Sequence, residues 1–94
     1  MAEYKFDGAE LRDRSGKKVG VLDGKYIRDD RGNRVGEING QCFMNSQGSR
    51  AAELVGTDIR DSRGQKIASI EEVKKLIDGY GGASIVGMWL FFVR

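Results

Sequence analysis

Short apolar stretches alternate with polar turns along most of this chain, and the turns recur at a fixed interval. Glycine stands at every eighth position, at Gly8, Gly16, Gly24, Gly32, Gly40, Gly48, Gly56 and Gly64. The wider similarity has a period of sixteen, since the segment 11–16 (LRDRSG) recurs with variation at 27–32, 43–48 and 59–64. Such periodicity is typical of a repeat architecture. We interpret the chain as four units, at about residues 8–23, 24–39, 40–55 and 56–71.

Each unit contains two turns of different type. Asp23-Gly24 and Asn39-Gly40 are typical of two-residue type I′ hairpins, in which both residues have positive φ. Val55-Gly56 fits this turn poorly, because a β-branched residue resists positive φ. The second turn reads Asp-x-x-Gly or Asn-x-x-Gly and indicates a type I turn. The intervening segments have the length of strands and not of helices.

These patterns predict a single, mainly β domain over residues 1–94. We expect a meander of about nine short antiparallel strands, rolled or barrel-like, followed by one helix and a long apolar final strand. A loop at Asp23-Gly24 would place Leu22 opposite Lys25 and would give each large apolar residue a small neighbour across the turn. The expected large and small pairs are Ile27 with Gly20, Phe43 with Gly36 and Ile59 with Ala52. One face of the sheet is then apolar and needs a cover.

The C-terminal quarter departs from the glycine pattern. Ser69 and Glu72 form a capping box, and Ile70, Val73, Leu76 and Ile77 fall on one face of a helix predicted over about 70–78. Gly79 is placed to end this helix, and residues 79–82 read as a connector.

An almost uninterrupted apolar run follows and is predicted to be a strand over about 84–93. A strand that is apolar on both faces must be covered on both. We favour a core strand between the meander and the helix. The alternative is an oligomer seam through Trp89, Phe91 and Phe92, which would allow a homodimer.

The amino-acid composition limits the kinds of catalytic and metal-binding site that the chain can form. The 94 residues include no His and one Cys, so the commonest general base and metal ligand are missing, as is an internal disulfide. The aspartates at positions 13, 29 and 61 are explained by turn formation, and Asn45 takes the same place in its unit. Cys42 reads as an unpaired surface thiol. The sequence therefore predicts no catalytic, cofactor-binding or metal-binding residues, and we expect no enzyme activity.

Cations recur at two phases of the repeat, although the net charge is only +2. Columns of such side chains could follow a polyanion. The same register would pair Lys18 with Asp29, Arg34 with Asn45 and Arg50 with Asp61, which favours a solvated, self-neutralised face. The candidate polyanion contacts are Arg12, Arg28 and Arg60 at one phase and Lys18, Arg34, Arg50 and Lys66 at the other.

The tandem unit, written from this chain as Ile-Arg-Asp-x-x-Gly-x-Arg-Val-Gly-x-Ile-Asn-Gly, resembles small uncharacterised bacterial proteins with glycine-punctuated β-repeats of sixteen residues. The resemblance covers residues 4–71 and extends to the helix and the Trp-containing tail, and it implies no particular activity. A looser architectural likeness is to MORN-type hairpin repeats, which are associated with scaffolding and lipid contact. The Tyr-x-Gly and aromatic pattern of those repeats does not recur in the units of this chain, and their period is usually longer.

The sequence alone leaves two functions open. The first is a non-catalytic interaction or scaffold module that presents a regular β surface to a protein partner. The alternative is binding to a polyanion, either nucleic acid or an anionic envelope polymer or lipid surface. No secretory signal is recognisable and no apolar run is long enough to span a membrane, so we expect a cytoplasmic location.

Overall fold

The computed structural model describes residues 2–79 and 81–94, and its central feature is one ten-stranded sheet. Nine strands follow one another as an antiparallel meander, as predicted. They are β1 (Tyr4–Phe6), β2 (Glu10–Asp13), β3 (Lys18–Asp23), β4 (Tyr26–Asp29), β5 (Arg34–Asn39), β6 (Cys42–Asn45), β7 (Arg50–Val55), β8 (Asp58–Asp61) and β9 (Lys66–Ser69). The tenth strand, β10 (Ile77–Gly79), was not predicted and pairs in parallel with β1.

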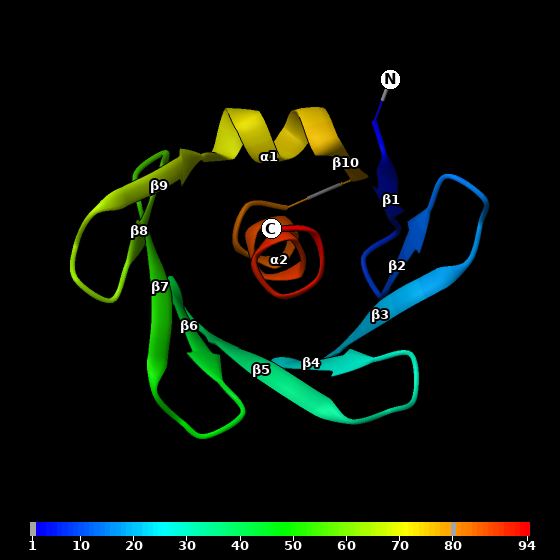
Figure 1. Ribbon diagram of the computed structural model, residues 1–94, viewed down its shortest axis with the longest axis horizontal. Helices are drawn as coiled ribbons and strands as arrows, with labels where there is room; N and C mark the ends of the chain where they lie inside the picture. The colour runs from blue at the N-terminus through cyan, green and yellow to red at the C-terminus, as the bar shows by residue number, and fades with distance from the viewer. Residues whose placement is uncertain (1, 80) are drawn as a thin grey trace.

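The sheet curves around the C-terminal segment but does not close (Figure 1). Its two edge strands are β9 and β10, and helix α1 (Ile70–Leu76) bridges the space between them. The chain then enters the middle of the curved sheet as helix α2 (Ala83–Met88), which continues as the π-helix η1 (Trp89–Val93). The core is therefore the space between the inner face of the sheet and this central helix.

The glycine turns lie one residue later than the sequence suggested. Asp23 pairs with Tyr26 and Leu22 with Ile27, so the two-residue loop is Gly24-Lys25. Gly24 has a φ of +63°, and no described residue other than glycine has positive φ. The predicted type I′ turn is therefore wrong, and glycine at the first loop position is the signature of type II′. The same register makes Val55 the last residue of β7, where a β-branched side chain is favourable.

This shift moves every predicted pair by two residues but leaves the faces of the sheet unchanged. Leu22, Gly20 and Ile27 share one face as expected, yet Gly20 lies opposite Asp29 in this hairpin and not opposite Ile27. The pairing of large with small residues occurs across the other set of hairpins. There, the opposed residues are Leu11 and Gly20, Ile27 and Gly36, Phe43 and Ala52, and Ile59 and Ala68.

The Asp-x-x-Gly turns form as predicted, and each is followed by a bulge. In the first, the Gly16 N–H donates to the Asp13 carbonyl at 3.0 Å. The register then shifts between Leu11 and Arg12, which leaves Val19 as the extra residue. A bulge redirects the side chains next to it. Val19 accordingly packs against the core, as do Val35 and Ile67 at the same place in other hairpins.

Successive hairpins are also joined at the glycine turns. The carbonyl of the residue after each of these turn glycines accepts a hydrogen bond from the backbone N–H of the residue thirteen positions later. The four bonds run from Leu22 to Ala9, Ile38 to Lys25, Leu54 to Gln41 and Ile70 to Thr57, at 2.6–2.9 Å. Backbone groups that a turn would leave to solvent are thus paired, which ties one hairpin to the next.

The predicted final strand over 84–93 is wrong, because this segment is helical. Its residues Ile85 to Trp89 are buried in succession, which a one-sided amphipathic helix would not show. A periodic test cannot separate a short buried strand from a short buried helix. Inside a curved sheet the segment has no free strand to pair with, and a helix satisfies its own backbone groups. The tail accordingly offers no strand for a dimer seam.

Helix α1 begins as predicted and ends earlier. The Glu72 N–H donates to the Ser69 hydroxyl at 3.3 Å, which confirms Ser69 as the N-cap. Val73 and Ile77 are buried, while Ile70 and Leu76 are partly buried. The helix stops at Leu76, and Gly79 does not end it in the left-handed conformation. Gly79 instead lies in β10, where an added Cβ would meet the Phe6 carbonyl oxygen at 2.5 Å. Tyr80, in the predicted connector, lies outside the described residues.

Candidate binding surface

The two kinds of turn lie at opposite ends of the strands, and they differ in charge. The Asp/Asn-x-x-Gly turns with their flanking residues, which we call the basic end, are segments 12–18, 28–34, 44–50 and 60–66. These carry four carboxylates, at Asp13, Asp29, Asp30 and Asp61, and eleven cations, at Arg12, Arg14, Lys17, Lys18, Arg28, Arg31, Arg34, Arg50, Arg60, Arg63 and Lys66.

The opposite ends of the same strands, which we call the acidic end, are segments 5–10, 21–26, 37–42 and 53–58. They carry two cations, at Lys5 and Lys25, and six carboxylates, at Asp7, Glu10, Asp23, Glu37, Glu53 and Asp58. The net charge of +2 for the whole chain therefore conceals +7 at one set of segments and −4 at the other. Sequence reasoning missed this separation, although it follows once the two turn types are assigned to the two ends of the hairpins.

The arginines at the first repeat phase, which were predicted as polyanion contacts, stabilise the Asp-x-x-Gly turns. The Nη1 atoms of Arg12, Arg28 and Arg60 donate to the carbonyls of the turn glycines at 16, 32 and 64, at 2.9–3.1 Å. Each also pairs with a carboxylate on the outer face, namely Glu10, Asp23 and Asp58 respectively. These guanidiniums are thus held in place at the basic end.

The cations at the second repeat phase have cross-strand partners that differ from the predicted ones. Lys18, Arg34 and Lys66 lie opposite Arg12, Arg28 and Arg60, and Arg50 lies opposite Met44. The expected pairs with Asp29, Asn45 and Asp61 are therefore wrong. Arg50 and Lys66 approach Glu53 and Asp58 at 3.7 and 3.4 Å, and the Arg34 guanidinium stands 5.5 Å from the Tyr26 ring centre. Three hairpins thus place cations directly opposite one another, which is unfavourable unless an anion is shared. In the β8–β9 hairpin Asp58 is such an anion, since it contacts both Arg60 and Lys66.

The turn carboxylates at this end point into their own turns. Asp13 Oδ1 accepts from the backbone N–H groups of Ser15 and Lys17 at 3.0 Å, and Asp29 Oδ1 accepts from those of Arg31 and Asn33 at 2.9 Å. The Ser15 hydroxyl lowers the pKa of Asp13, and the Asn33 N–H lowers the pKa of Asp29. Asn45 makes the same backbone hydrogen bonds without a charge. These residues have a turn-forming role, as predicted from the sequence.

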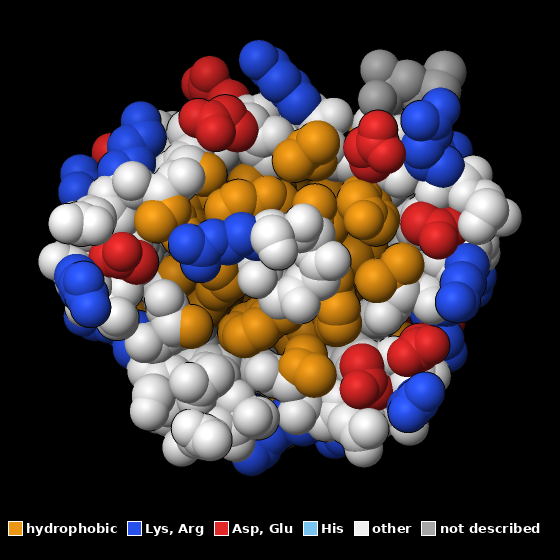
Figure 2. Space-filling model, in the orientation of Figure 1, with side chains coloured by type: hydrophobic (Ala, Val, Ile, Leu, Met, Phe, Trp, Pro, Cys, Tyr) orange, Lys and Arg blue, Asp and Glu red, His pale blue; other side chains and the backbone are white. Residues whose placement is uncertain are grey.

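The middle of the basic end is apolar. The central helix runs toward this end, since Gly87 lies against Ile38 whereas Phe91 and Phe92 lie over Gly36 and Gly20, nearer the Asp-x-x-Gly turns. Hydrophobic side chains gather around the end of the chain, and charged ones lie outside them (Figure 2). We call this the apolar centre; its partly exposed residues are Val19, Val35, Ile67, Leu90, Phe91, Phe92 and Val93.

The three aromatic residues singled out in the tail have different environments. Trp89 is 8% exposed and belongs to the core. The Phe92 ring fills the space that a Cβ on Gly20 would take, and the Phe91 ring does the same at Gly36. The two glycines are therefore small because aromatic rings of the central helix rest on them, a reason that the sequence did not reveal.

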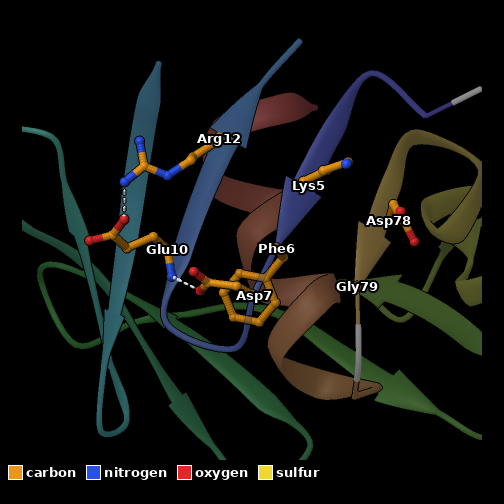
Figure 3. A pocket seen from close by; sticks show the side chains of 7 residues that line it. All are labelled: Lys5, Phe6, Asp7, Glu10, Arg12, Asp78 and Gly79. Atoms are coloured by element: carbon orange, nitrogen blue, oxygen red, sulfur yellow. Dashed lines mark hydrogen bonds and ion pairs between the residues drawn. The ribbon is translucent and has the colours of Figure 1, made fainter. Parts of the chain in front are cut away.

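A groove lies on the outer face where β10, β1 and β2 meet. Its volume is about 400 Å³, and it is lined by Lys5, Phe6, Asp7, Glu10, Arg12, Asp78 and Gly79 (Figure 3). Asp7 accepts from the N–H groups of Glu10 and Ala9, which lowers the pKa of its carboxyl, and Glu10 pairs with Arg12. Asp7, Glu10 and Arg12 in this groove are thus engaged in local structure.

Cys42 is partly buried, with Glu53 opposite it in β7 and Asn39 opposite it in β5. Within residues 2–79 and 81–94, no three metal-ligating side chains of His, Cys, Asp or Glu come together. No helix in the same ranges combines the length and apolar character needed to cross a membrane.

Comparisons with protein-family models, with curated proteins and with solved structures gave no significant match for this chain. The function must therefore be argued from the chemistry of the surface.

Proposed function

We propose that the protein is a non-catalytic module that binds an anionic macromolecular surface through its basic end. Of the two functions that the sequence left open, this is the polyanion hypothesis. The observation that carries it is the excess of cations at the basic end, eleven against four carboxylates, which includes cations opposite one another at Arg12 and Lys18 and at Arg28 and Arg34. A phosphate or sulfate lying between two such side chains removes their repulsion and gains two charge-assisted hydrogen bonds.

The central helix accounts for only a small part of this charge separation. It points its C-terminal end at the basic end, and a helix terminus carries roughly half an elementary charge. Cations near that terminus stabilise the helix, but the effect falls off within about one turn. Eleven cations distributed over four hairpins far exceed what the helix requires. The excess favours an external anion as the partner.

Retention on immobilised heparin, a linear polyanion, tests this proposal. We expect the protein to bind at low salt and to elute as NaCl rises from about 50 mM toward about 500 mM, because binding releases condensed counterions. The test variant combines Lys17→Gln, Arg31→Gln and Arg63→Gln at exposed turn positions. We expect it to elute at markedly lower salt.

The matched control lowers the net charge by the same three units at the acidic end. It combines Asn39→Asp, Gln41→Glu and Thr57→Glu, all at exposed positions beside the glycine turns. Its retention should stay close to that of the unchanged protein. Equal losses in both variants would mean that only the overall charge matters, and no retention at all would contradict the proposal.

A further inference from the structure

We infer that the anionic surface is that of a lipid bilayer, against which the molecule lies with its basic end as a peripheral module. This inference rests on the proposed function and adds a second observation, the apolar centre. Leu90, Phe91, Phe92 and Val93 remain partly exposed at the middle of the end that carries the cations. Nucleic acid offers anions without a matching apolar layer at that spacing, whereas a bilayer interface offers both.

The shape of the molecule fits a flat partner. Its principal extents are 35 × 28 × 18 Å, and the face seen down the shortest axis is the one on which the apolar centre lies (Figure 2). The Asp/Asn-x-x-Gly turns spread outward around this face (Figure 1). Carboxylates and cations both lie around the apolar side chains on this face (Figure 2), and the cations among them can meet headgroups while the centre contacts the acyl boundary. The structure therefore places both kinds of contact on one broad face.

A second copy of the chain fits the basic end and its apolar centre less well than a bilayer does. Its acidic end would complement the cations, but that end provides little apolar surface to cover the apolar centre. Val55, at 47%, is the one large hydrophobic side chain among the described residues that is clearly exposed. It lies at the acidic end, and a single valine covers little apolar surface. The bilayer is thus the partner that satisfies both parts of the surface.

Co-sedimentation with vesicles tests the inference. The probes are vesicles of phosphatidylcholine alone and of phosphatidylcholine with about 30% phosphatidylglycerol. We expect binding to the anionic vesicles only. The Lys17→Gln, Arg31→Gln, Arg63→Gln variant should bind them at least tenfold more weakly, and the acidic-end control should bind as the unchanged protein does.

Two variants at Val93 test the apolar contact. Val93→Gln should weaken vesicle binding about threefold to tenfold and leave heparin retention unchanged. Val93→Trp should strengthen vesicle binding, and its added indole should shift its emission to the blue in the presence of anionic vesicles. Because Val93 is the last residue of η1, native Trp89 emission in Val93→Gln and an unchanged circular dichroism spectrum in Val93→Trp check that the fold is retained.

The outcomes separate this inference from the proposed function. Heparin retention without binding to anionic vesicles would overturn the bilayer and leave the polyanion proposal standing. Vesicle binding that neither Val93 variant alters would likewise overturn insertion of the apolar centre. Loss of both heparin and vesicle binding in the unchanged protein would contradict both.

Discussion

The ring of Phe92 occupies the space that a side chain on residue 20 would fill, so the two positions fit together because Gly20 has no Cβ. Phe92 belongs to the last turn of the central helix, and Gly20 lies in β3, seventy-two positions earlier. The same relationship joins Phe91 and Gly36 in β5. These two contacts fix the C-terminal end of the helix against the inner face of the sheet.

This fit predicts a strong coupling between residues 20 and 92. Gly20→Ala should lower the free energy of unfolding by about 1–3 kcal/mol, because the added methyl overlaps the ring. The double variant Gly20→Ala, Phe92→Ala should lose clearly less than the sum of the two single changes. Denaturant titrations of the four proteins measure this. Phe91→Ala combined with Gly20→Ala is the control, since Phe91 lies over Gly36, and its effects should add.

The type II′ turns predict a difference between two adjacent exposed positions. Gly40 has a φ of +65°, whereas Gln41 follows it without positive φ. Gly40→Ala should lower the melting temperature, with a cost of about 1–2 kcal/mol from the left-handed backbone. Gln41→Ala should leave it nearly unchanged. Similar melting temperatures for the two variants would mean that the turn is assigned to the wrong residues.

The turn aspartates predict a loss of stability in acid. The pKa values of Asp7, Asp13 and Asp29 are lowered in the folded protein by hydrogen bonds to their carboxylates. A group with a lowered folded pKa stabilises the protein above its unfolded value near 3.8, and this contribution disappears as the pH falls through the folded pKa. Denaturant midpoints should therefore decrease as the pH falls from about 5 to about 3.

Asparagine substitution isolates that effect, because Asn45 already makes the same backbone hydrogen bonds in its turn. The Asp13→Asn, Asp29→Asn variant should show a shallower decrease of the midpoint over the same pH range. A decrease as steep as in the unchanged protein would show that other carboxylates cause the acid sensitivity.

The sequence predicted the meander because its turns are encoded locally. Glycine at fixed spacing and Asp at the start of each Asp-x-x-Gly turn specify where the strands end, and the structure places them there. The exact register was not accessible, because Asp23-Gly24 suits a type I′ turn and Gly24-Lys25 suits a type II′ turn equally well by composition. That single choice decided the predicted partners of Lys18, Arg34 and Arg50.

The conformation of the tail depended on information that is not local. Residues 85–93 form an apolar run of the length of a buried strand, and they become a helix because the curved sheet and α1 surround them. The small residues Gly20 and Gly36 were recognised, but their neighbours on the central helix were not. The cations of the binding surface were all visible in the sequence, whereas their separation from the carboxylates emerged only when the hairpins were assembled.

The glycine amides supply the most direct test of the claim that the basic end is the binding surface. They form two sets of built-in reporters, Gly16, Gly32, Gly48 and Gly64 at the basic end and Gly8, Gly24, Gly40 and Gly56 at the acidic end. Two-dimensional NMR spectra would be recorded during titration with a short heparin oligosaccharide and, separately, with small anionic bicelles. We expect the first set to shift or broaden with both ligands while the second set stays in place. Changes confined to the second set, or no changes in either, would contradict the account.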